Sequence, residues 1–335
     1  MTTTDRAAAL LEDILAGPAE LAAVAELQRA AIAAIPAAVL ARPRWRLVGM
    51  GSSRFAAMDT ATRLRAAGYD AHAEVASALS PSPGGRDTIL VAVSSSGQTP
   101  EVLEAVERHR GTSFVVGLTA DTASPLAGLA NAVLPLRATR AEQAGIACLA
   151  YRATVAALLG LTVRADGGPA WRPAEAVSAL EMVIADRGPW LGAAADVLDG
   201  ARDVHVLGDG SRAGAAEQAA LMLREAPRLP ATAFDTGDWL HVGLYTLFPG
   251  DPVLLFGGAR ADLDALQTIR NRGGCVVAVG PVPDSAPMDV HVALPEIASA
   301  QKPVRLLVES VVAELLAAEL WRRTDAVPAG ERSRA

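Results

Sequence analysis

The sequence predicts an α/β protein built from two related copies of a unit with a mainly parallel sheet. Apolar runs typical of buried strands end in small polar residues, and a helical pattern follows each of them. This order occurs over residues 45–165 and returns over residues 176–328. A glycine- and proline-containing stretch of low periodicity, near residues 164–175, separates the two copies. Repeated strand, loop and helix favour a parallel sheet with helices on both faces.

The predicted domains divide the chain into four parts. Residues 1–44 are rich in alanine and leucine at helical spacing, and interruptions at Pro18 and Pro36 predict two helices before the first strand. The first α/β domain covers residues 45–165, the second covers residues 176–328, and a tail covers residues 329–335. Two halves of about 150 residues each suit the length of the chain.

Individual segments support the two copies. RLVGMGSS, TILVAVSSSGQT and SFVVGLT each combine a strand with its following loop, and CLAYRATVAALLGLTV predicts a long apolar helix that closes the first domain. DVHVLGDGS then parallels RWRLVGMGS, and DPVLLFGGARAD parallels the serine-rich unit. The second copy lacks the serines of the first, so we expect the two copies to differ in chemistry.

Composition and charge exclude several classes of function. Hydrophobic residues make up 51% of the chain, yet no uninterrupted apolar run approaches the ~20 residues that cross a bilayer. The N-terminus has no basic region before an apolar core, so we expect a cytoplasmic protein without a cleaved signal or a membrane partner. A net charge of -7 without a basic block argues against nucleic acid. Cys148 and Cys275 lie outside any Cys/His cluster, so we expect no metal.

A serine-rich loop, Ser94 to Thr99, is the strongest candidate for a binding site. It follows the apolar run TILVAV and precedes a helical pattern, so its hydroxyls and backbone N–H groups converge at a helix N-terminus, where a phosphate is favoured. Helix capping explains any single serine equally well. Three consecutive serines and a threonine exceed the needs of one cap, which favours phosphate. The loop Gly49 to Ser53 is predicted to lie beside it.

Four motifs together resemble the SIS (sugar isomerase) family, most closely the isomerase half of glucosamine-6-phosphate synthase. GMGSSRFAA, SSSGQT, LTADTASPLAGLANAVLPL and GDWLHVG occur in the family's order and approximate spacing, and the similarity runs from about residue 10 to about residue 328. The resemblance implies two flavodoxin-like SIS subdomains in tandem after the N-terminal helices. It also implies a homodimer whose sites use residues from both subunits, and chemistry without a cofactor.

The resemblance also assigns the residues of the site. The residues implied to bind the sugar or its phosphate are Gly51, Ser52, Ser53, Ser94, Ser95, Ser96, Gln98, Thr99 and Cys148. Glu225, in ALMLREA, resembles the family's catalytic carboxylate, and His241, in GDWLH, resembles its ring-opening histidine. The spacing between the two equals the family spacing. Without the resemblance, we would interpret Glu225 as a solvated charge at a helix end.

Several positions depart from the family pattern. Gln143 replaces a glutamate, Cys148 replaces a ligand-facing serine, and Gln218 and Met222 stand where the synthase has a glutamate and a lysine. Lys302 is the only lysine, so the tail that contains Arg332 and Arg334 cannot form the Schiff base made by the synthase. With no amino-terminal cysteine nucleophile and no glutaminase domain, we expect no glutamine-dependent amidotransferase activity.

The preferred hypothesis is an isomerase or deaminase that acts on a hexose or amino-sugar 6-phosphate through open-chain C1–C2 proton transfer. A noncatalytic sugar-phosphate sensor, or a deglycase or dehydratase of the same family, remains the alternative, and the sequence does not identify the sugar. A third hypothesis is a nucleotide cofactor, because Gly208 to Ala213 fit GxGxxA. It is weak, because no acidic residue is expected to end the next strand about 20 residues later.

Overall fold

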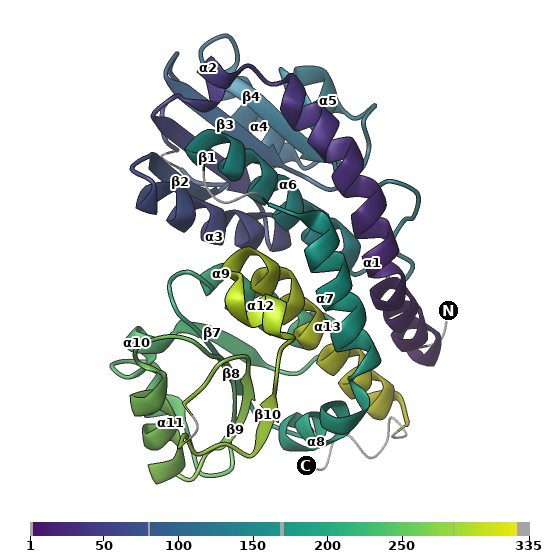
Figure 1. Ribbon diagram of the computed structural model, residues 1–335, viewed down its shortest axis with the longest axis vertical. Coiled ribbons are helices and arrows are strands. Elements are labelled where there is room, and N and C mark those ends of the chain that lie inside the picture. Colours follow the sequence, from purple (N-terminus) through teal and green to yellow (C-terminus); the bar gives the residue numbers. More distant parts are fainter. Residues whose placement is uncertain (1–2, 80, 168–170, 284, 327–335) are drawn as a thin grey trace. The chain divides into compact units, whose positions relative to one another are not determined.

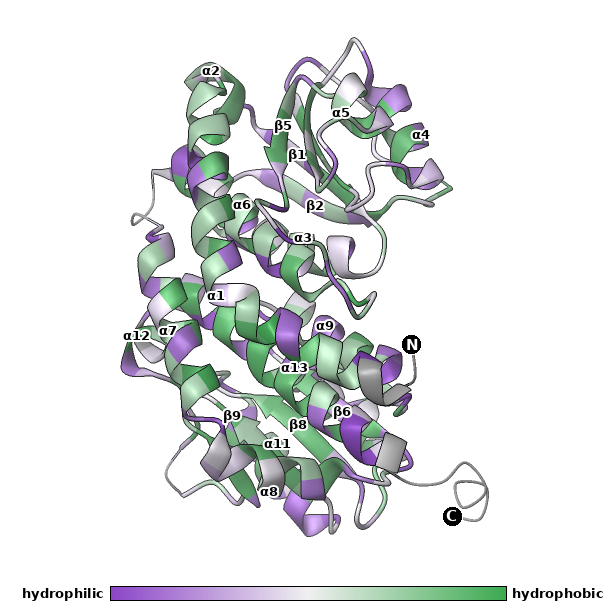
Figure 2. Cartoon of the chain, turned by 90° about the vertical axis from the view of Figure 1, so that its right-hand side faces the viewer, coloured by the Kyte–Doolittle hydropathy of each residue, from purple (hydrophilic) through white to green (hydrophobic). Residues whose placement is uncertain are grey.

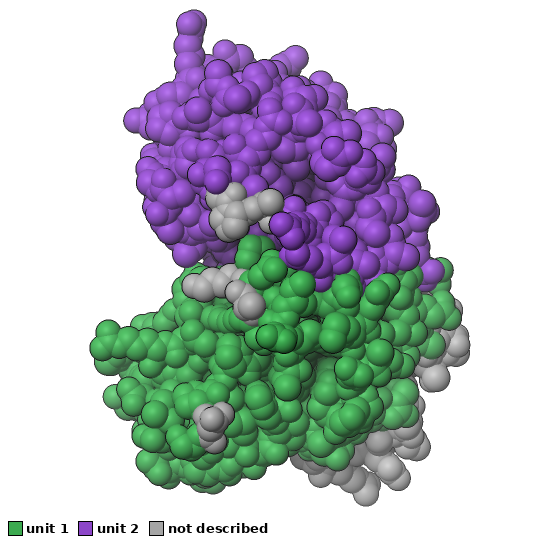
Figure 3. Space-filling view, viewed as in Figure 1, with its two compact units in different colours: residues 1–16, 142–146, 178–335 green, residues 17–141, 147–177 purple. Residues whose placement is uncertain are grey.

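The computed structural model describes residues 3–79, 81–167, 171–283 and 285–326, which divide into two compact units (Figure 3). One unit comprises residues 17–141 and 147–177 and contains the first sheet. The other comprises residues 1–16, 142–146 and 178–335 and contains the second sheet. Each sheet has five strands that are all parallel, which confirms the predicted α/β class.

The first sheet has the strand order β2-β1-β3-β4-β5, and the first four of these strands are labelled in Figure 1. Its strands are β1 (Arg44–Gly49), β2 (Asp70–Val75), β3 (Thr88–Val93), β4 (Phe114–Thr119) and β5 (Ala132–Pro135). The central strand, β3, is buried along its whole length, as a strand covered on both faces must be. The helices of this part are α3 (Ser52–Ala66), α4 (Pro100–His109), α5 (Pro125–Leu129) and α6 (Cys148–Asp166).

The second sheet repeats the same connectivity. Its order is β10-β9-β8-β6-β7, so β6 takes the place of β1 and β8 the place of β3. The strands are β6 (Val204–Gly208), β7 (Ala231–Asp235), β8 (Pro252–Phe256), β9 (Cys275–Val279) and β10 (Val290–Val292). In both sheets the second strand lies on one side of the first, and the third, fourth and fifth strands follow on the other side. This strand order is that of flavodoxin-like folds, and its switch point lies between the first and third strands.

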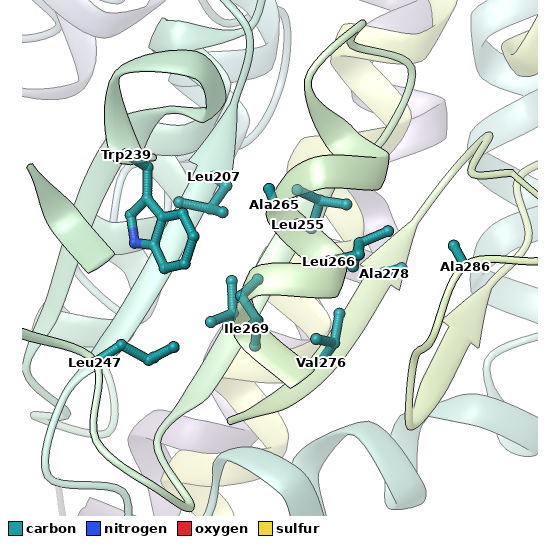
Figure 4. Close-up of a cluster of buried hydrophobic side chains, with 11 residues drawn as sticks. Leu207, Trp239, Leu247, Leu255, Ala265, Leu266, Ile269, Val276, Ala278 and Ala286 are labelled. Carbon is teal, nitrogen blue, oxygen red and sulfur yellow. The ribbon is translucent and has the colours of Figure 1, made fainter. Parts of the chain in front are cut away.

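Helices cover both faces of the second sheet. They are α8 (Gly188–Leu198), α9 (Ala213–Glu225), α10 (Thr236–Trp239), the 3-10 helix η1 (Gly243–Thr246), α11 (Asp262–Asn271), α12 (Glu296–Ala300) and α13 (Lys302–Ala326). Helix α9 contacts β6 and β7 and packs on α13. On the face shown in Figure 4, Ala265, Leu266 and Ile269 of α11 pack against strand residues such as Leu207, and Trp239 closes the cluster. The green colour of β8 in Figure 2 shows that its own residues are mainly hydrophobic, and all five are buried.

The N-terminal helices correct one prediction. Helix α1 (Thr3–Ala34) continues through Pro18, so the predicted break there is wrong, and the second helix is the short α2 (Ala37–Leu40) after Pro36. A proline in a helix interior costs about 3 kcal/mol or more. Burial of Leu10 and Ile14 before Pro18, and of Leu21 after it, offsets that cost.

Helix α6 is also the one described helix long and apolar enough to span a membrane. However, 78% of its most apolar window is buried in the fold, as expected of the core helix that the sequence predicts. It ends at Asp166, and α7 (Pro173–Ala185) begins at Pro173, so both helices extend into the glycine- and proline-containing stretch.

Candidate functional site

Strand pairing brings the two predicted loops to the same edge of the first sheet. β1 pairs with β3 in parallel, and Val48 lies opposite Ala92. The loop Gly49 to Ser53 follows β1, and the loop Ser94 to Thr99 follows β3. Both loops therefore leave the carboxyl edge where the sheet reverses its strand order, which is where open α/β folds bind ligands.

The serine loop has an ordered internal geometry. Ser94 is buried, and its Oγ lies 2.8 Å from Oγ1 of Thr99 in a hydrogen bond that either hydroxyl can donate. The N–H of Ser94 donates to the carbonyl of Leu118, and the N–H of Gly97 donates to the carbonyl of Ser94. Gly97 has φ +65°, and a Cβ there would lie 2.0 Å from Oγ of Ser124. Only glycine fits at this turn.

The loop leaves donors free for a ligand. Within the described residues, no hydrogen bond uses the backbone N–H of Ser95, Ser96 or Thr99. Thr99 is the N-cap residue of α4, yet its side chain makes no capping bond. Capping alone therefore does not explain these residues. Ser96 and Gln98 are exposed, and the Ser96 hydroxyl accepts from the N–H of Gln98.

The free donors come from a different place than the sequence predicted. We expected them among the N–H groups in the first turn of the helix that follows the loop. Pro100 has no N–H, and the N–H groups of Val102 and Leu103 donate to the carbonyl of Thr99. The free backbone donors therefore come chiefly from the loop itself.

Two residues that the sequence analysis missed support the loop from β4 and α5. Thr119 Oγ1 donates to the carbonyl of Ser95 at 3.2 Å, and the N–H of Ala120 donates to the same carbonyl. Ser124 is the N-cap of α5 and contacts Gly97. The Ser-Pro pair at the start of α5 is a sequence signal for such a cap.

The companion loop places its serines at the start of α3. Gly51 has φ +49° and precedes the helix, and Ser52 and Ser53 are half-buried in its first turn. A Cβ on Gly49 would lie 2.8 Å from Cβ of Ser53. This close approach fixes the helix start beside the end of β1.

The segment between β5 and α6, which contains Gln143, is held by two carboxylates of α1. Glu20 accepts hydrogen bonds from the N–H groups of Ala138 and Thr139 and from the Thr139 hydroxyl, and these bonds lower its pKa although burial opposes them. Asp13 accepts from the N–H of Gln143 at 2.7 Å. Cys148, predicted to face the ligand, has no exposed surface at the start of α6.

Glu225 and His241 lie in the unit of the second sheet. Glu225 is the last residue of α9 and is half-buried, and burial raises its pKa despite the nearby Arg228 and Arg224. Glu225 is therefore not the fully solvated charge at a helix end that it would be without the family resemblance. His241 is exposed, after α10. Among the described residues, no hydrogen bond or ion pair joins the two side chains.

A buried histidine anchors the turn that precedes His241. Trp239 Nε1 donates to Nδ1 of His205 at 2.9 Å, and the Thr246 hydroxyl lies 3.4 Å from Nε2 of the same ring. Burial lowers the pKa of His205, which favours the neutral ring that can accept from Trp239. His205 therefore has a structural role in this turn.

The remaining predicted positions are placed as follows. Gln218 and Met222 are buried in α9. Arg332 and Arg334 lie outside the described residues, as does the side chain of Lys302. Contrary to expectation, an acidic residue does end β7, but Asp235 accepts from the N–H groups of Gly237 and Asp238 as the cap of α10. Within the described residues, no cluster of three or more His, Cys, Asp or Glu side chains could hold a metal.

Comparisons with known proteins confirm the resemblance. No family model matches the sequence. The isomerizing glutamine–fructose-6-phosphate aminotransferase of Aeropyrum pernix is 29% identical over 313 residues, which cover 86% of this chain and 48% of the relative. The chain thus spans about half the length of the curated relative that it matches.

Two solved structures share the fold. The tagatose-6-phosphate ketose/aldose isomerase of Escherichia coli has a TM-score of 0.76 at 18% identity, covering 96% of this chain and 92% of that one. The glucosamine-6-phosphate deaminase of Thermotoga maritima has a TM-score of 0.72 at 18% identity, covering 96% and 98%. The chain has the fold of SIS-type phosphosugar enzymes.

Proposed function

We propose that this chain, with the SIS-type fold of phosphosugar isomerases and deaminases, is itself an enzyme acting on a hexose or amino-sugar 6-phosphate. The two sheets are its tandem SIS subdomains. The reaction moves a proton between C1 and C2 of the open-chain sugar, in an isomerisation or a deamination. The loop after β3 binds the phosphate, and Glu225 and His241 carry the proton transfers.

The observation that carries this proposal is the set of free donors in the serine loop. The N–H groups of Ser95 and Ser96, together with the hydroxyls of Ser94 and Thr99, can surround the oxygens of one phosphate. Hydrogen bonds to a charged group contribute about 1.5–3 kcal/mol each. The loop supplies these donors without a carboxylate that would repel an anion.

Glu225 is suited to proton transfer because burial raises its pKa. A general base works best when its pKa lies near the working pH, and burial moves a glutamate in that direction. His241 is exposed at the end of an anchored turn, so it can exchange protons with a ligand. The family resemblance assigns the histidine to ring opening.

Binding is tested by thermal shift with sugar 6-phosphates and their unphosphorylated parents. A ligand at 100 times its Kd should stabilise the protein by about 2.7 kcal/mol. Fructose 6-phosphate, tagatose 6-phosphate and glucosamine 6-phosphate are the first probes. Stabilisation by the unphosphorylated parents alone contradicts a phosphate anchor.

Catalysis is tested by proton exchange with deuterated water at C1 and C2 of each sugar phosphate that binds. Exchange supports the isomerase or deaminase. Binding without exchange favours the noncatalytic sensor, an alternative supported by the uncharged Gln218 and Met222 in α9. Release of ammonia from an amino-sugar phosphate distinguishes a deaminase from an isomerase.

We further propose that the active form is a homodimer. Val242, Tyr245 and Phe248 expose large apolar side chains in the segment that follows His241. Contact with a second copy would cover them beside the candidate catalytic histidine. Light scattering should give a dimer, and replacing all three residues by serine should give a monomer with little turnover. A monomeric protein with full turnover contradicts the dimer.

A further inference from the structure

The loops after β3 and β8 occupy corresponding positions in the two sheets. Leu255 of β8 lies opposite Leu207 of β6, as Ala92 of β3 lies opposite Val48 of β1. Ser94 and Gly257, the first residue after each strand, both donate their N–H to a carbonyl of the next strand. Counted from the strand ends, Thr99 and Asp262 are then equivalent.

The two loops use their equivalent backbone donors differently. In the first loop, the N–H groups of Ser95 and Ser96 have no partner among the described residues. In the second loop, the matching N–H groups of Gly258 and Ala259 both donate to Oδ2 of Asp262, at 2.6 and 2.8 Å. A carboxylate oxygen of the chain itself therefore occupies the position where a phosphate oxygen would bind in the first loop.

Two buried arginines complete the anion-binding character of the second loop. A Cβ on Gly258 would lie 2.7 Å from Nη2 of Arg212 and 3.0 Å from Nη1 of Arg305, so both guanidinium groups reach the loop. Arg212 and Arg305 are 3% and 8% exposed, and Asp262 is 1% exposed. Backbone N–H groups beside arginines are a composition typical of oxyanion sites.

Carboxylates of the chain already balance this positive charge. Arg212 lies 3.0 Å from Asp209 and 3.2 Å from the buried Glu309. With Asp262, three carboxylates face two guanidinium groups. An added phosphate would have to displace Asp262 and would then face Asp209 and Glu309, which repel it. The second loop is therefore closed to anions as long as Asp262 stays in place.

We propose that Asp262 is an internal substitute for a phosphate, which masks a second oxyanion site and leaves the chain with one sugar-phosphate site. This inference rests on the proposed function, because it takes the first loop to be the phosphate site. Asp262 is then a specificity-determining residue, because it decides which of two equivalent loops accepts a ligand.

A residue exchange between the loops tests this assignment by isothermal titration calorimetry. Thr99→Asp places a carboxylate in the first loop and should weaken sugar-phosphate binding at least about 100-fold, whereas Thr99→Asn, without the charge, should weaken it less. In a chain that also contains Ser94→Ala, Ser96→Ala and Thr99→Ala, Asp262→Thr should increase affinity for inorganic phosphate at least about tenfold. Asp262→Asn in the same background keeps an acceptor in place and should give no increase.

The outcomes separate this inference from the proposed function. Titration of the parent chain should reach one fructose 6-phosphate per chain, and two would overturn the masking by Asp262. If the parent binds and Thr99→Asp abolishes binding, but a folded Asp262→Thr chain gains no phosphate affinity, the inference fails and the proposed function stands. If Asp262→Thr does not fold by circular dichroism, Asp262→Ser replaces it in the same titration. If the parent binds no sugar phosphate, the proposed function fails first.

Discussion

The two sheets share their strand order, yet their equivalent loops have opposite electrostatics. After β3, uncharged hydroxyls surround free backbone donors, and Gly97 makes the tight turn. After β8, Asp262 binds the corresponding donors, and buried Arg212 and Glu309 form an ion pair beside it. The same backbone arrangement therefore has free donors in the first loop and donors bonded to a carboxylate in the second, and a few side chains decide which.

The proposed function assigns binding and chemistry to different units. The sheet with the open loop carries the hydroxyls, whereas the unit of the closed loop carries Glu225, whose pKa burial raises, and His241. In the second loop the N–H groups of Gly258 and Ala259 are bonded to Asp262, and the proposed function gives this unit the proton transfer instead of phosphate binding.

The largest effect should follow removal of the first loop's hydroxyls. Ser94→Ala, Ser96→Ala and Thr99→Ala together should weaken sugar-phosphate binding by roughly 1,000-fold, because several hydrogen bonds to a charged group are lost. The fold should survive, because Ser94 and Thr99 bond to each other and both partners are removed. Calorimetry measures the loss. Ser211→Ala, which removes a hydroxyl bonded to Asp209 in the other unit, should leave affinity unchanged.

Glu225→Gln should lower turnover by roughly 100-fold with little change in phosphate binding, since the shape remains and the base is lost. The raised pKa of Glu225 also fixes the pH dependence. A base must be ionised, so kcat/KM of the parent should increase with pH through a pKa above the ordinary value for glutamate. Steady-state kinetics of both proteins should show this increase of kcat/KM with pH only in the parent. The same increase in Glu225→Gln would show that Glu225 is not the base.

Gly97→Ala tests the turn that keeps the first loop open. A non-glycine residue at φ +65° is strained, and the added Cβ would collide with the buried Ser124. We expect a loss of about 2–3 kcal/mol in the free energy of unfolding, measured with urea. The equivalent position after β8 is the exposed Arg260, and Arg260→Ala should change stability by less than about 0.5 kcal/mol. Equal effects would contradict the difference between the two turns.

The smallest effect concerns the charge of Asp262. Burial raises its pKa, and nearby Asp209 raises it further, although the N–H groups of Ala259 and Gly258 and Arg212 oppose this. The folded protein therefore holds this proton more tightly than the unfolded chain. The contribution of Asp262 to stability should fall as pH rises from the unfolded pKa through the folded pKa. Urea unfolding should show Asp262→Asn gaining stability relative to the parent over that interval. A relative loss would show that the ionised carboxylate stabilises the fold.

Local sequence pattern was sufficient for the sheets and for the serine loop, because both depend on neighbours in the chain. Apolar runs followed by small polar residues predicted β1, β3 and β4 and the loops at their ends. The break predicted at Pro18 is wrong, because tertiary burial of α1 outweighs local helix propensity. The ligand-binding role of Cys148 stays a prediction from family position, and its side chain has no exposed surface at the start of α6.

The closed loop and its arginines could not be predicted in the same way. An aspartate in the first turn of α11 reads as an ordinary favourable charge at a helix N-terminus. Its bonds to Gly258 and Ala259, and the approach of Arg305 from α13, depend on tertiary structure. The motif Gly208 to Ala213 was likewise ambiguous until the position of Asp235 was known.

The bonds from α1 to the segment before α6 have a consequence for the order of folding during synthesis. Glu20 and Thr139 are 119 residues apart in the chain, and Asp13 and Gln143 are 130 apart. Such non-local contacts slow folding, because loop closure must precede them. Helix α1 therefore cannot form these bonds until every strand of the first sheet has been synthesised. The segment that contains Gln143 is then held by a helix that was made before that sheet.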